Sequence, residues 1–290
     1  MKVFISADIE GITTTTQCLK WRRGSGRRKN IEGITTTTQW PDTDAGSLTY
    51  KEHTLQMTKE VNAACEGAIA AGAKEIFVKD AHDSAMNIDQ TVLPECVKIH
   101  RRWSGDPYSM VEGIDESFDA AMFIGYHNAA SIGNNPLSHT MNTRNVYVKL
   151  NEVLASEFMF FSYAAAYRKV PTVFLSGDKG LCEEAMKMNP NHPNLITLPV
   201  KEGIGYSTIN YSPNLMVKMI KEKTKEALSQ DFKGKLLKLP NHFKLEVCYK
   251  EHGYAHKVSF YPNAKKINDT TVVFENNDYY EILRALKFIL

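Results

Sequence analysis

Short apolar runs alternate with stretches of helical periodicity along the first two thirds of the chain. Four of the runs predict strands, over Val3–Ser6, Glu75–Lys79, Ala121–Gly125 and Pro171–Ser176. Helices are predicted before the second and the fourth strand, over Tyr50–Ala71 and Ser156–Arg168, with Gly72 as a suitable stop for the first helix. Alternation of strand and helix is typical of a parallel sheet flanked by helices, so the predicted fold class is α/β.

The pattern changes after about residue 195. A helix is predicted from Ser212 to about Leu228, with Pro213 in its first turn. Three strands and a last helix are predicted after it, over Phe243–Tyr249, His256–Tyr261, Thr270–Phe274 and Tyr279–Ile289. We therefore predict two domains: an α/β catalytic domain over residues 1–195 and a smaller C-terminal α+β domain over residues 196–290, which takes part in oligomer contacts.

Composition is that of an ordinary globular protein, with 43% hydrophobic and 23% charged residues. No run of about 18 apolar residues predicts a membrane span. The N-terminal sequence MKVFISADIEG predicts a strand rather than a signal peptide. The five cysteines are odd in number and form no CxxC pair, which favours free thiols in a reducing cytoplasm.

The nine residues IEGITTTTQ occur twice, at 9–17 and at 31–39. The segment 18–39 contains six basic residues and a single acidic one, Glu32, so its net charge is +5. The formal net charge of the whole chain is +2, so the rest of the chain is acidic. A cluster rich in Arg and Gly can bind nucleic acid, but no fold signature of nucleic-acid recognition accompanies this one. The cluster therefore favours a solvated loop, and we predict no nucleic-acid or membrane partner.

Side chains suited to metal binding follow the predicted strands. Because the carboxyl ends of parallel strands meet at one edge of a sheet, these side chains are expected to lie close together. Two histidines and three carboxylates suit zinc or a similar divalent ion, and five ligands favour two metals bridged by a carboxylate. The candidates are Asp8 and Glu10 after the first strand, His82 after the second, His127 after the third, and Glu157 at the start of the helix before the fourth.

Each of these residues also has an ordinary structural interpretation. Asp8 and Glu10 could cap a helix or line a loop, His82 could be a hydrogen-bonded surface histidine, and Glu157 could favour a helix N-terminus. The residues alone leave His139 open as a metal ligand, a general acid or base, or a loop residue. The sequence contains no GxSxG, P-loop or GxGxxG motif, which argues against serine-hydrolase, nucleotide-hydrolase and dinucleotide-binding functions.

Five short motifs occur in order along the chain: SADIEG at 6–11, KDAHDSAMN at 79–87, FIGYHNAAS at 123–131, PLSHTM at 136–141 and ASEF at 155–158. Together they resemble the motifs of the M55 family of D-aminopeptidases. The resemblance implies small peptide substrates with an N-terminal D-residue, such as D-Ala-D-Ala, and a ring-like homo-oligomer, for example a decamer. It also implies two zinc ions per chain, with Asp8 bridging them, Glu10, His82, His127 and Glu157 completing their shells, and His139 as the catalytic side chain.

In such a site, His139 could transfer a proton or stabilise the tetrahedral oxyanion, and the sequence does not decide between the two. The bulky run 158–161 that follows Glu157 differs from our expectation for D-alanine-releasing members, and it favours another side-chain size. Two alternatives stay open. One is a dinuclear metal amidohydrolase of another small amide, and the other is a non-catalytic metal-binding oligomer blocked by the 18–39 loop.

The two copies of the repeat differ in what precedes them. The first follows a predicted strand and carries Asp8, whereas the second follows GSGRRK and has Asn30 in place of the aspartate. An amide does not bridge two cations as a carboxylate does. Removing 18–39 leaves the continuous passage SADIEGITTTTQWPDTDAG. We therefore predict that the first copy binds metal and that 18–39 loops out as an inserted duplication.

Overall fold

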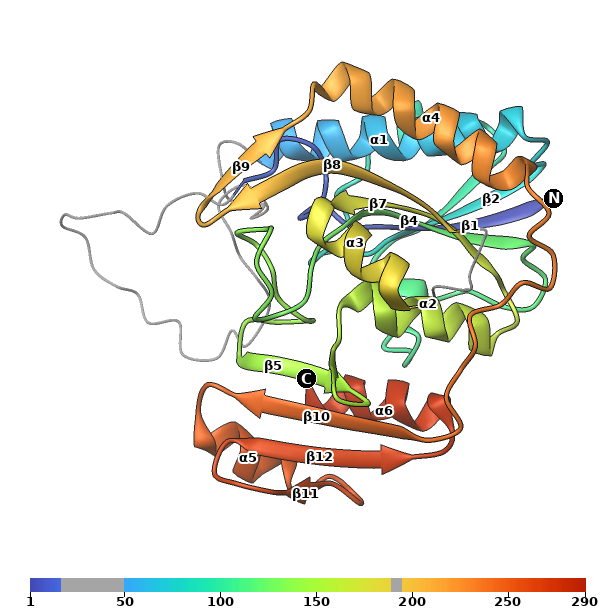
Figure 1. The fold of residues 1–290 in the computed structure, drawn as a ribbon. Helices are drawn as coiled ribbons and strands as arrows, with labels where there is room; N and C mark the ends of the chain where they lie inside the picture. Colours follow the sequence, from blue (N-terminus) through green and yellow to red (C-terminus); the bar gives the residue numbers. More distant parts are fainter. Residues whose placement is uncertain (17–49, 189–194) are drawn as a thin grey trace.

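The computed structural model describes residues 1–16, 50–188 and 195–290, which form two sheets with helices around them (Figure 1). The seven-stranded sheet contains β1 (Lys2–Ala7), β2 (Glu75–Asp80), β3 (Val97–His100), β4 (Ala120–Tyr126), β7 (Thr172–Asp178), β8 (Ile196–Ile204) and β9 (Ser207–Asn210). The five-stranded sheet contains β5 (Asn145–Leu150), β6 (Val153–Leu154), β10 (Phe243–Tyr249), β11 (Lys265–Lys266) and β12 (Thr271–Asn276). The helices are α1 (Tyr50–Ala70), α2 (Glu157–Tyr167), α3 (Lys179–Met188), α4 (Pro213–Ser229), α5 (His252–Val258) and α6 (Tyr279–Ile289), with short 3₁₀ turns at Gln90–Val92 and Ser109–Val111.

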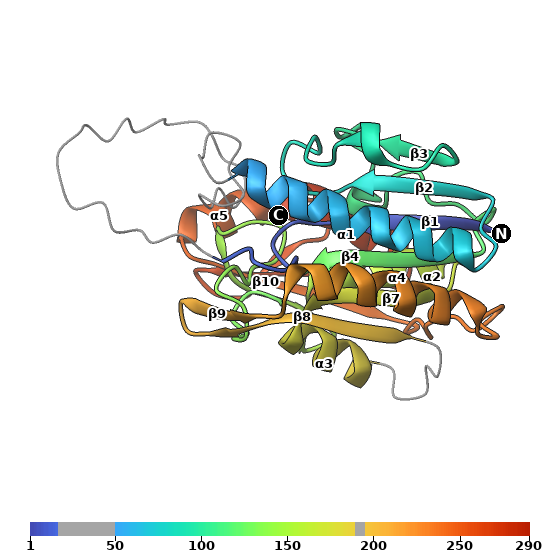
Figure 2. The ribbon, with the colours of Figure 1, turned by 90° about the horizontal axis from the view of Figure 1, so that it is seen from above.

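The large sheet has the strand order β3-β2-β1-β4-β7-β8-β9 and is parallel except for β9. Helices α1 and α4 lie side by side over one face (Figure 2), and α2 and α3 lie on the other (Figure 1). Every residue of β4 and β7 is buried, because a parallel sheet is covered on both faces. The predicted α/β class, the four predicted strands and both helices of the first two thirds are confirmed.

Helix α1 shows how the sequence pattern becomes packing. Met57, Val61, Ala64 and Ala68 lie three or four residues apart, and each is completely buried against the sheet and α4. The helix ends before Gly72, whose φ of +93° lies in the left-handed region that glycine tolerates best. The predicted stop is therefore confirmed.

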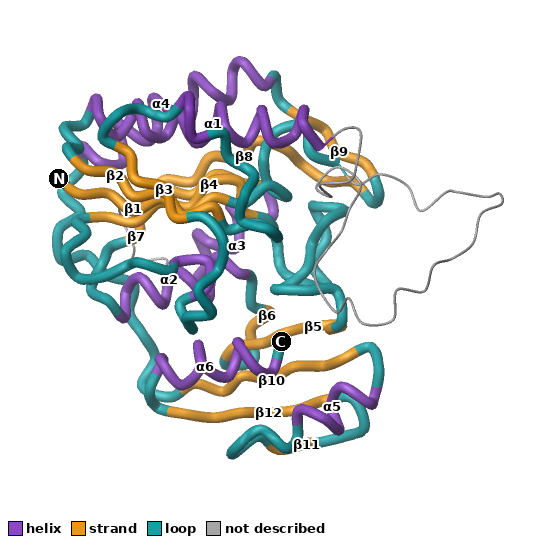
Figure 3. The backbone as a smooth tube through the Cα atoms, turned by 180° about the vertical axis from the view of Figure 1, so that it is seen from behind, coloured by secondary structure: helices purple, strands orange, loops and turns teal. Residues whose placement is uncertain are grey.

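The smaller sheet is antiparallel, with the order β11-β12-β10-β5-β6. Helix α6 lies between this sheet and α2 (Figures 1 and 3). It buries Ile282, Leu283 and Leu286 in the core cluster that also contains Phe158 and Phe161 of α2. The core of the smaller sheet is therefore continuous with that of the large sheet.

The two sheets do not divide at the predicted residue 195. Strands β8 and β9 and helix α4, which follow this residue, complete the large sheet and its cover, whereas β5 and β6, which precede it, join the smaller sheet. Strand β5 pairs with β10, where Val148 lies opposite Val247. A local pattern shows that a strand has an apolar face, but the partner that covers the face comes from distant parts of the chain.

The strand predicted over His256–Tyr261 is wrong. Helix α5 occupies His252–Val258, and it buries Ala255 and Val258 three residues apart while Phe260 is 76% exposed. The alternating residues of this stretch resemble a strand, but the three-residue spacing of the two buried side chains decides the local structure. The predicted strands Phe243–Tyr249 and Thr270–Phe274 and the last helix are confirmed.

The structure also bears on the predictions for the cysteines and for membrane-spanning helices. Cys65, Cys96, Cys182 and Cys248 are free thiols, and Cys18 lies outside the described residues. None of the helices in the described part of the chain has the length and apolar character that crossing a membrane requires. The predicted 18–39 loop and the second copy of the repeat also lie outside the described residues.

Candidate metal centre

The predicted metal-binding side chains meet at the carboxyl edge of the large sheet. Strand β1 pairs in parallel with β2 on one side and with β4 on the other, which brings the residues after all three strands together. The six predicted side chains are at most 6% exposed: Asp8, Glu10, His82, His127, His139 and Glu157. Parallel pairing of neighbouring strands therefore brings the side chains that follow β1, β2 and β4 together.

Backbone contacts hold the loop after β1 against β4. The Asp8 amide donates to the Ile124 carbonyl oxygen at 2.9 Å, and the Gly11 amide donates to the Gly125 carbonyl oxygen at 2.8 Å. A Cβ atom on Gly11 would lie 1.8 Å from the Tyr126 carbonyl oxygen, so a glycine is required there. This close approach fixes the direction in which Asp8 and Glu10 leave the backbone.

The loop after β2 is shaped by Asp80. Its carboxylate accepts from the Asn87 and Ile88 amides at 2.6 and 2.9 Å and from the Asn87 side-chain amide at 2.7 Å. The same Asn87 amide group also donates to the His82 carbonyl oxygen at 2.8 Å. His82 is consequently held with its Nδ1 atom 2.8 Å from Glu10 Oε2 and 3.2 Å from Asp8 Oδ1.

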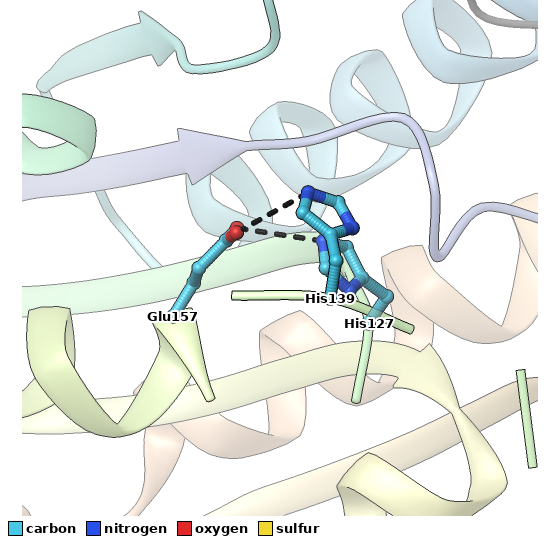
Figure 4. A group of neighbouring side chains, drawn as sticks. All are labelled: His127, His139 and Glu157. Atoms are coloured by element: carbon cyan, nitrogen blue, oxygen red, sulfur yellow. Dashed lines mark ion pairs between the residues drawn. The ribbon is translucent and has the colours of Figure 1, made fainter. Parts of the chain in front are cut away.

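Two other histidines stack beside Glu157, as Figure 4 shows. The rings of His127 and His139 are 4.2 Å apart and nearly parallel. His127 Nδ1 donates to the Asn128 carbonyl oxygen at 2.9 Å, and His139 Nδ1 donates to that of Leu137 at 2.8 Å. A carbonyl oxygen only accepts, so both Nδ1 atoms carry a proton, and the Nε2 atom of each ring is the one that faces the centre and can bind a metal or a proton.

Glu157 is the first residue of α2. Ser156 caps the helix by accepting from the Met159 amide at 3.1 Å, and the Glu157 Oε1 atom accepts from the Met141 amide at 2.7 Å. Its two oxygens lie 3.4 Å from His127 Nε2 and 3.5 Å from His139 Nε2. The cap therefore aims the carboxylate at the two stacked rings.

Two groups of three ligands result, Asp8–Glu10–His82 and His127–His139–Glu157. Asp8 faces both groups, because its Oδ1 lies 3.2 Å from His82 and its Oδ2 lies 3.5 Å from His127. Separations of 3.4 to 3.5 Å are long for hydrogen bonds. They agree with the roughly 3.3 Å expected between two ligand atoms around one tetrahedral zinc ion with bonds of about 2.0 Å.

Several buried atoms of the cluster have no hydrogen-bond partner among the described residues: Asp8 Oδ2, Glu10 Oε1, His82 Nε2 and His127 Nε2. A buried polar atom without a partner is costly, and two unpartnered carboxylate oxygens beside two bare nitrogens are a donor set for a divalent cation. The residues therefore fit a metal ion.

Without a cation the cluster holds protons instead. Burial, reinforced by repulsion from Glu10, raises the pKa of Asp8 to about 8. Burial opposes the charged form of His127, but Glu157 and Asp8 outweigh it and raise its pKa to about 10. Burial and the neighbouring His127 charge together lower the pKa of His139. A bound cation would displace the first two protons, whereas His139 is already poised as a neutral base.

A cavity of about 230 Å³ opens onto the cluster. Its wall also includes Trp103, Met110, Met141 and Lys287. The bulky run 158–161 does not line it. Those side chains are buried in the core, where the Phe158 ring packs edge-on against the Phe123 ring at 5.2 Å, and Phe161 lines a neighbouring cavity instead.

Sequence reasoning missed the residues that support the cluster from behind. Lys201 of β8 is fully buried and donates to the carbonyl oxygens of Glu10 and Thr15, the latter at 2.6 Å. Asp178 accepts from the Asn128 and Leu181 amides and from Asn135, all within 3.1 Å. Asp178 ends a strand, as the predicted ligands do, and this was a usable signal, whereas nothing in the local pattern distinguished Lys201.

Comparison with known proteins gives a consistent result. A family model for peptidase family M55, described as D-aminopeptidase, matches residues 28–288. A D-aminopeptidase of Bacillus subtilis (strain 168) is 33% identical over 296 residues, covering 99% of this chain and 95% of the relative. A solved structure, the Zn-dependent D-aminopeptidase DppA from Bacillus subtilis, described as a self-compartmentalizing protease, superposes with a TM-score of 0.85. It is 27% identical and covers 100% of this chain and 96% of that one.

The family match begins at residue 28 and therefore contains the second copy of the repeat rather than the first. In sequence the two copies are identical, so an alignment can use either. The structure brings Asp8 and Glu10, which precede or belong to the first copy, into contact with His82. The side chains at the first copy therefore lie beside the other predicted ligands, whereas the second copy lies outside the described residues.

Proposed function

The chain belongs to the M55 family of D-aminopeptidases, and we propose that the acid–imidazole cluster is the catalytic centre of a zinc-dependent peptide hydrolase. In this proposal two zinc ions are held by Asp8, Glu10, His82, His127 and Glu157, with Asp8 as the bridge. The observation that carries it is the position of Asp8, whose two oxygens face the two ligand groups separately. The description of the solved neighbour as Zn-dependent favours zinc over other divalent ions.

When bound, zinc supplies Lewis-acid polarisation of the scissile carbonyl and activation of a water molecule. His139 supplies proton transfer. Its Nε2 atom faces the centre, its Nδ1 proton is held by the Leu137 carbonyl, and its lowered pKa keeps it neutral near pH 7. A neutral Nε2 would accept a proton from the attacking water and pass it to the leaving amine.

The substrate in this proposal is a short peptide with a free N-terminal D-residue. Three of the four carboxylates that line the cavity are proposed zinc ligands, and the fourth, that of Asp83, is left to attract the positive charge of a free peptide N-terminus. Preference for the D-configuration is inferred from the family and from the D-aminopeptidase names of the relatives. Neither the amidohydrolase of another small amide nor the non-catalytic oligomer gains support from these comparisons.

We also infer a homo-oligomer, because the solved neighbour is described as self-compartmentalizing. The β8–β9 hairpin and the residues after it offer a contact surface within 196–290. Four large apolar side chains there are at least half exposed: Ile204, Tyr206, Ile209 and Tyr211. A ring that encloses the centres, for example a decamer, follows from the family resemblance. The free thiols favour the cytoplasm as the location of the protein. Light scattering of the wild type and of Tyr206→Lys tests the surface, since loss of the contact lowers the mass.

The catalytic proposal is tested by zinc content and hydrolysis measured together. We expect about two zinc ions per chain, release of D-alanine from D-Ala-D-Ala, loss of turnover on chelation and recovery on adding zinc. L-Ala-L-Ala is the control for configuration. Zinc-loaded protein that releases no amino acid from D-peptides would contradict the catalytic proposal. Hydrolysis that persists after complete removal of metal would contradict the role of zinc.

A further inference from the structure

A second cavity adjoins the metal centre. It has a volume of about 160 Å³ and shares Ser109, Met141 and Lys287 with the cavity that opens onto the cluster. Its remaining walls are largely apolar and combine side chains of α2 and α6 with Pro107, Asn142, Arg144 and Leu290. They include Phe161, Leu283 and Leu286. The two cavities are therefore neighbouring compartments, with Lys287 at their border.

The size and lining of the second cavity suit an apolar side chain larger than a methyl group. An apolar cavity of about 150 Å³ in another protein is large enough to bind benzene. A space of about 160 Å³ walled by Phe161, Leu283 and Leu286 accordingly accepts a phenyl or branched aliphatic group. The methyl group of alanine would leave most of this apolar surface uncovered.

The two compartments also differ in the charged side chains that line them. Four carboxylates line the first, whereas the charged side chains that line the second are those of Arg144 and Lys287. The Arg144 guanidinium already donates to the Leu290 carbonyl oxygen and lies over the Tyr254 ring at 5.4 Å. Within the described residues the Lys287 ammonium has neither an ion pair nor a hydrogen bond. It is thus the cation at the border that a ligand can engage.

We propose that the second cavity is the subsite for the residue that follows the scissile bond, and that Lys287 pairs with the free carboxylate of that residue. The inference rests on the proposed function. A dipeptide carries a free carboxylate on the residue after the scissile bond, and Lys287, at the border of the two cavities, is the cation that can pair with it. Because the carboxylate and the side chain share one Cα atom, a cation at the border and an apolar pocket serve the same residue. The preferred substrates are then D-dipeptides with a bulky apolar C-terminal residue.

Hydrolysis of three substrates by the zinc-loaded protein tests the subsite. We expect kcat/KM for D-Ala-D-Phe to exceed that for D-Ala-D-Ala by at least about tenfold, the effect of filling an apolar pocket. Lys287→Met should raise KM about fivefold for D-Ala-D-Phe, since an exposed ion pair contributes little more. It should leave kcat and the turnover of D-Ala-D-Phe amide unchanged. Lys225→Met, an exposed lysine on α4 that lines neither cavity, is the matched control.

A pocket-filling variant provides an independent readout. Leu286→Phe fills part of the pocket and should lower the ratio of kcat/KM for D-Ala-D-Phe to kcat/KM for D-Ala-D-Ala. Equal kcat/KM for the two dipeptides in the wild type, or an unchanged KM for D-Ala-D-Phe in Lys287→Met, would overturn the subsite and leave the peptidase intact. If no D-peptide is cleaved, the peptidase proposal fails. Calorimetry of D-Ala-D-Phe on the metal-free protein then decides the subsite, and equal affinity for wild type and Lys287→Met refutes it.

Discussion

Two buried charged regions meet at Glu10, and they differ in whether the protein alone satisfies them. In the first region, the candidate metal centre, four side-chain atoms lack a hydrogen-bond partner among the described residues: one oxygen each of Asp8 and Glu10 and one nitrogen each of His82 and His127. In the second region, the network behind the centre, Lys201 donates to two carbonyl oxygens, and both carboxylate oxygens of Asp178 accept hydrogen bonds. Both regions are almost completely inaccessible to solvent.

The difference separates a ligand site from its support. A buried charge whose hydrogen-bond partners are all supplied by the protein makes the structure more rigid and does not need a ligand. A buried set with unpartnered acceptors facing one another is costly until a cation joins it. The metal centre can therefore be distinguished from the network behind it by hydrogen-bond saturation, although both consist of charged side chains at strand ends.

The largest effect is expected from Asp8→Asn, which removes the proposed bridging carboxylate from the metal centre. An amide cannot bridge two cations, so we expect zinc content to fall and hydrolysis to drop to the level of the metal-free protein. Near pH 7 the metal-free variant should be about as resistant to heat as the metal-free wild type, because Asp8, with its pKa raised to about 8, is already largely neutral there. Metal analysis, D-Ala-D-Ala hydrolysis and calorimetric melting measure these effects.

Asp83→Asn is the control for this variant, since Asp83 lines the same cavity but belongs to neither ligand group. It should keep its zinc. Full zinc content in Asp8→Asn would show that Asp8 is not a ligand.

His139→Asn tests whether His139 acts on the substrate or on the metal. As a proton-transfer group it should lower kcat by roughly 100- to 10,000-fold. Zinc content should be unchanged, because the other five side chains hold the metals in our proposal. Kinetics and metal analysis on the same sample separate the two roles. A parallel loss of zinc and activity would make His139 a ligand instead.

Lys201→Met tests the saturated region. Loss of its bonds to the Glu10 and Thr15 carbonyls should weaken zinc affinity or activity by about 10- to 100-fold, as outer partners of metal ligands do. The effect is expected to be smaller than that of losing a ligand. Zinc titration against a competing chelator measures it, with the exposed Lys225→Met as control. An affinity equal to that of the wild type would mean that the network does not position Glu10.

The same lysine predicts a pH dependence of stability. Burial lowers the pKa of Lys201 to about 8, so between about pH 8 and its usual value of 10.5 the folded chain binds fewer protons than the unfolded chain. The stability of the wild type relative to Lys201→Met should therefore rise as pH increases through this window and fall as pH decreases through 8. Denaturant unfolding of both metal-free proteins measures the difference. A flat difference would refute the lowered pKa.

The smallest effect is expected from deleting residues 18–39. Asp8, Glu10 and the residues of the first copy remain, so zinc content and kcat/KM should match those of the full chain. The full chain and the deletion variant, assayed side by side, provide the comparison. A deletion variant that gains zinc or activity would show that the segment obstructs the centre.

Much of the site could be predicted because each ligand stands at a strand end or a helix start. Asp8, His82 and His127 follow apolar runs that are recognisable without a partner, and parallel strands bring such ends together. The path of the chain through the smaller sheet was not predictable in the same way. Strand β5 and strand β10 are separated by about a hundred residues, and their pairing depends on faces that become complementary only after folding.

The sequence by itself determined the α/β order of elements, and it predicted the candidate metal-binding side chains and the choice of Asp8 over Asn30, because these depend on residue type and local period. Tertiary structure alone decided which charged residues are saturated, as for Lys201 and Asp178, and it placed Lys287 at the border of two cavities. The physical reason is that hydrogen-bond saturation and cavity walls are properties of atoms brought together from distant segments.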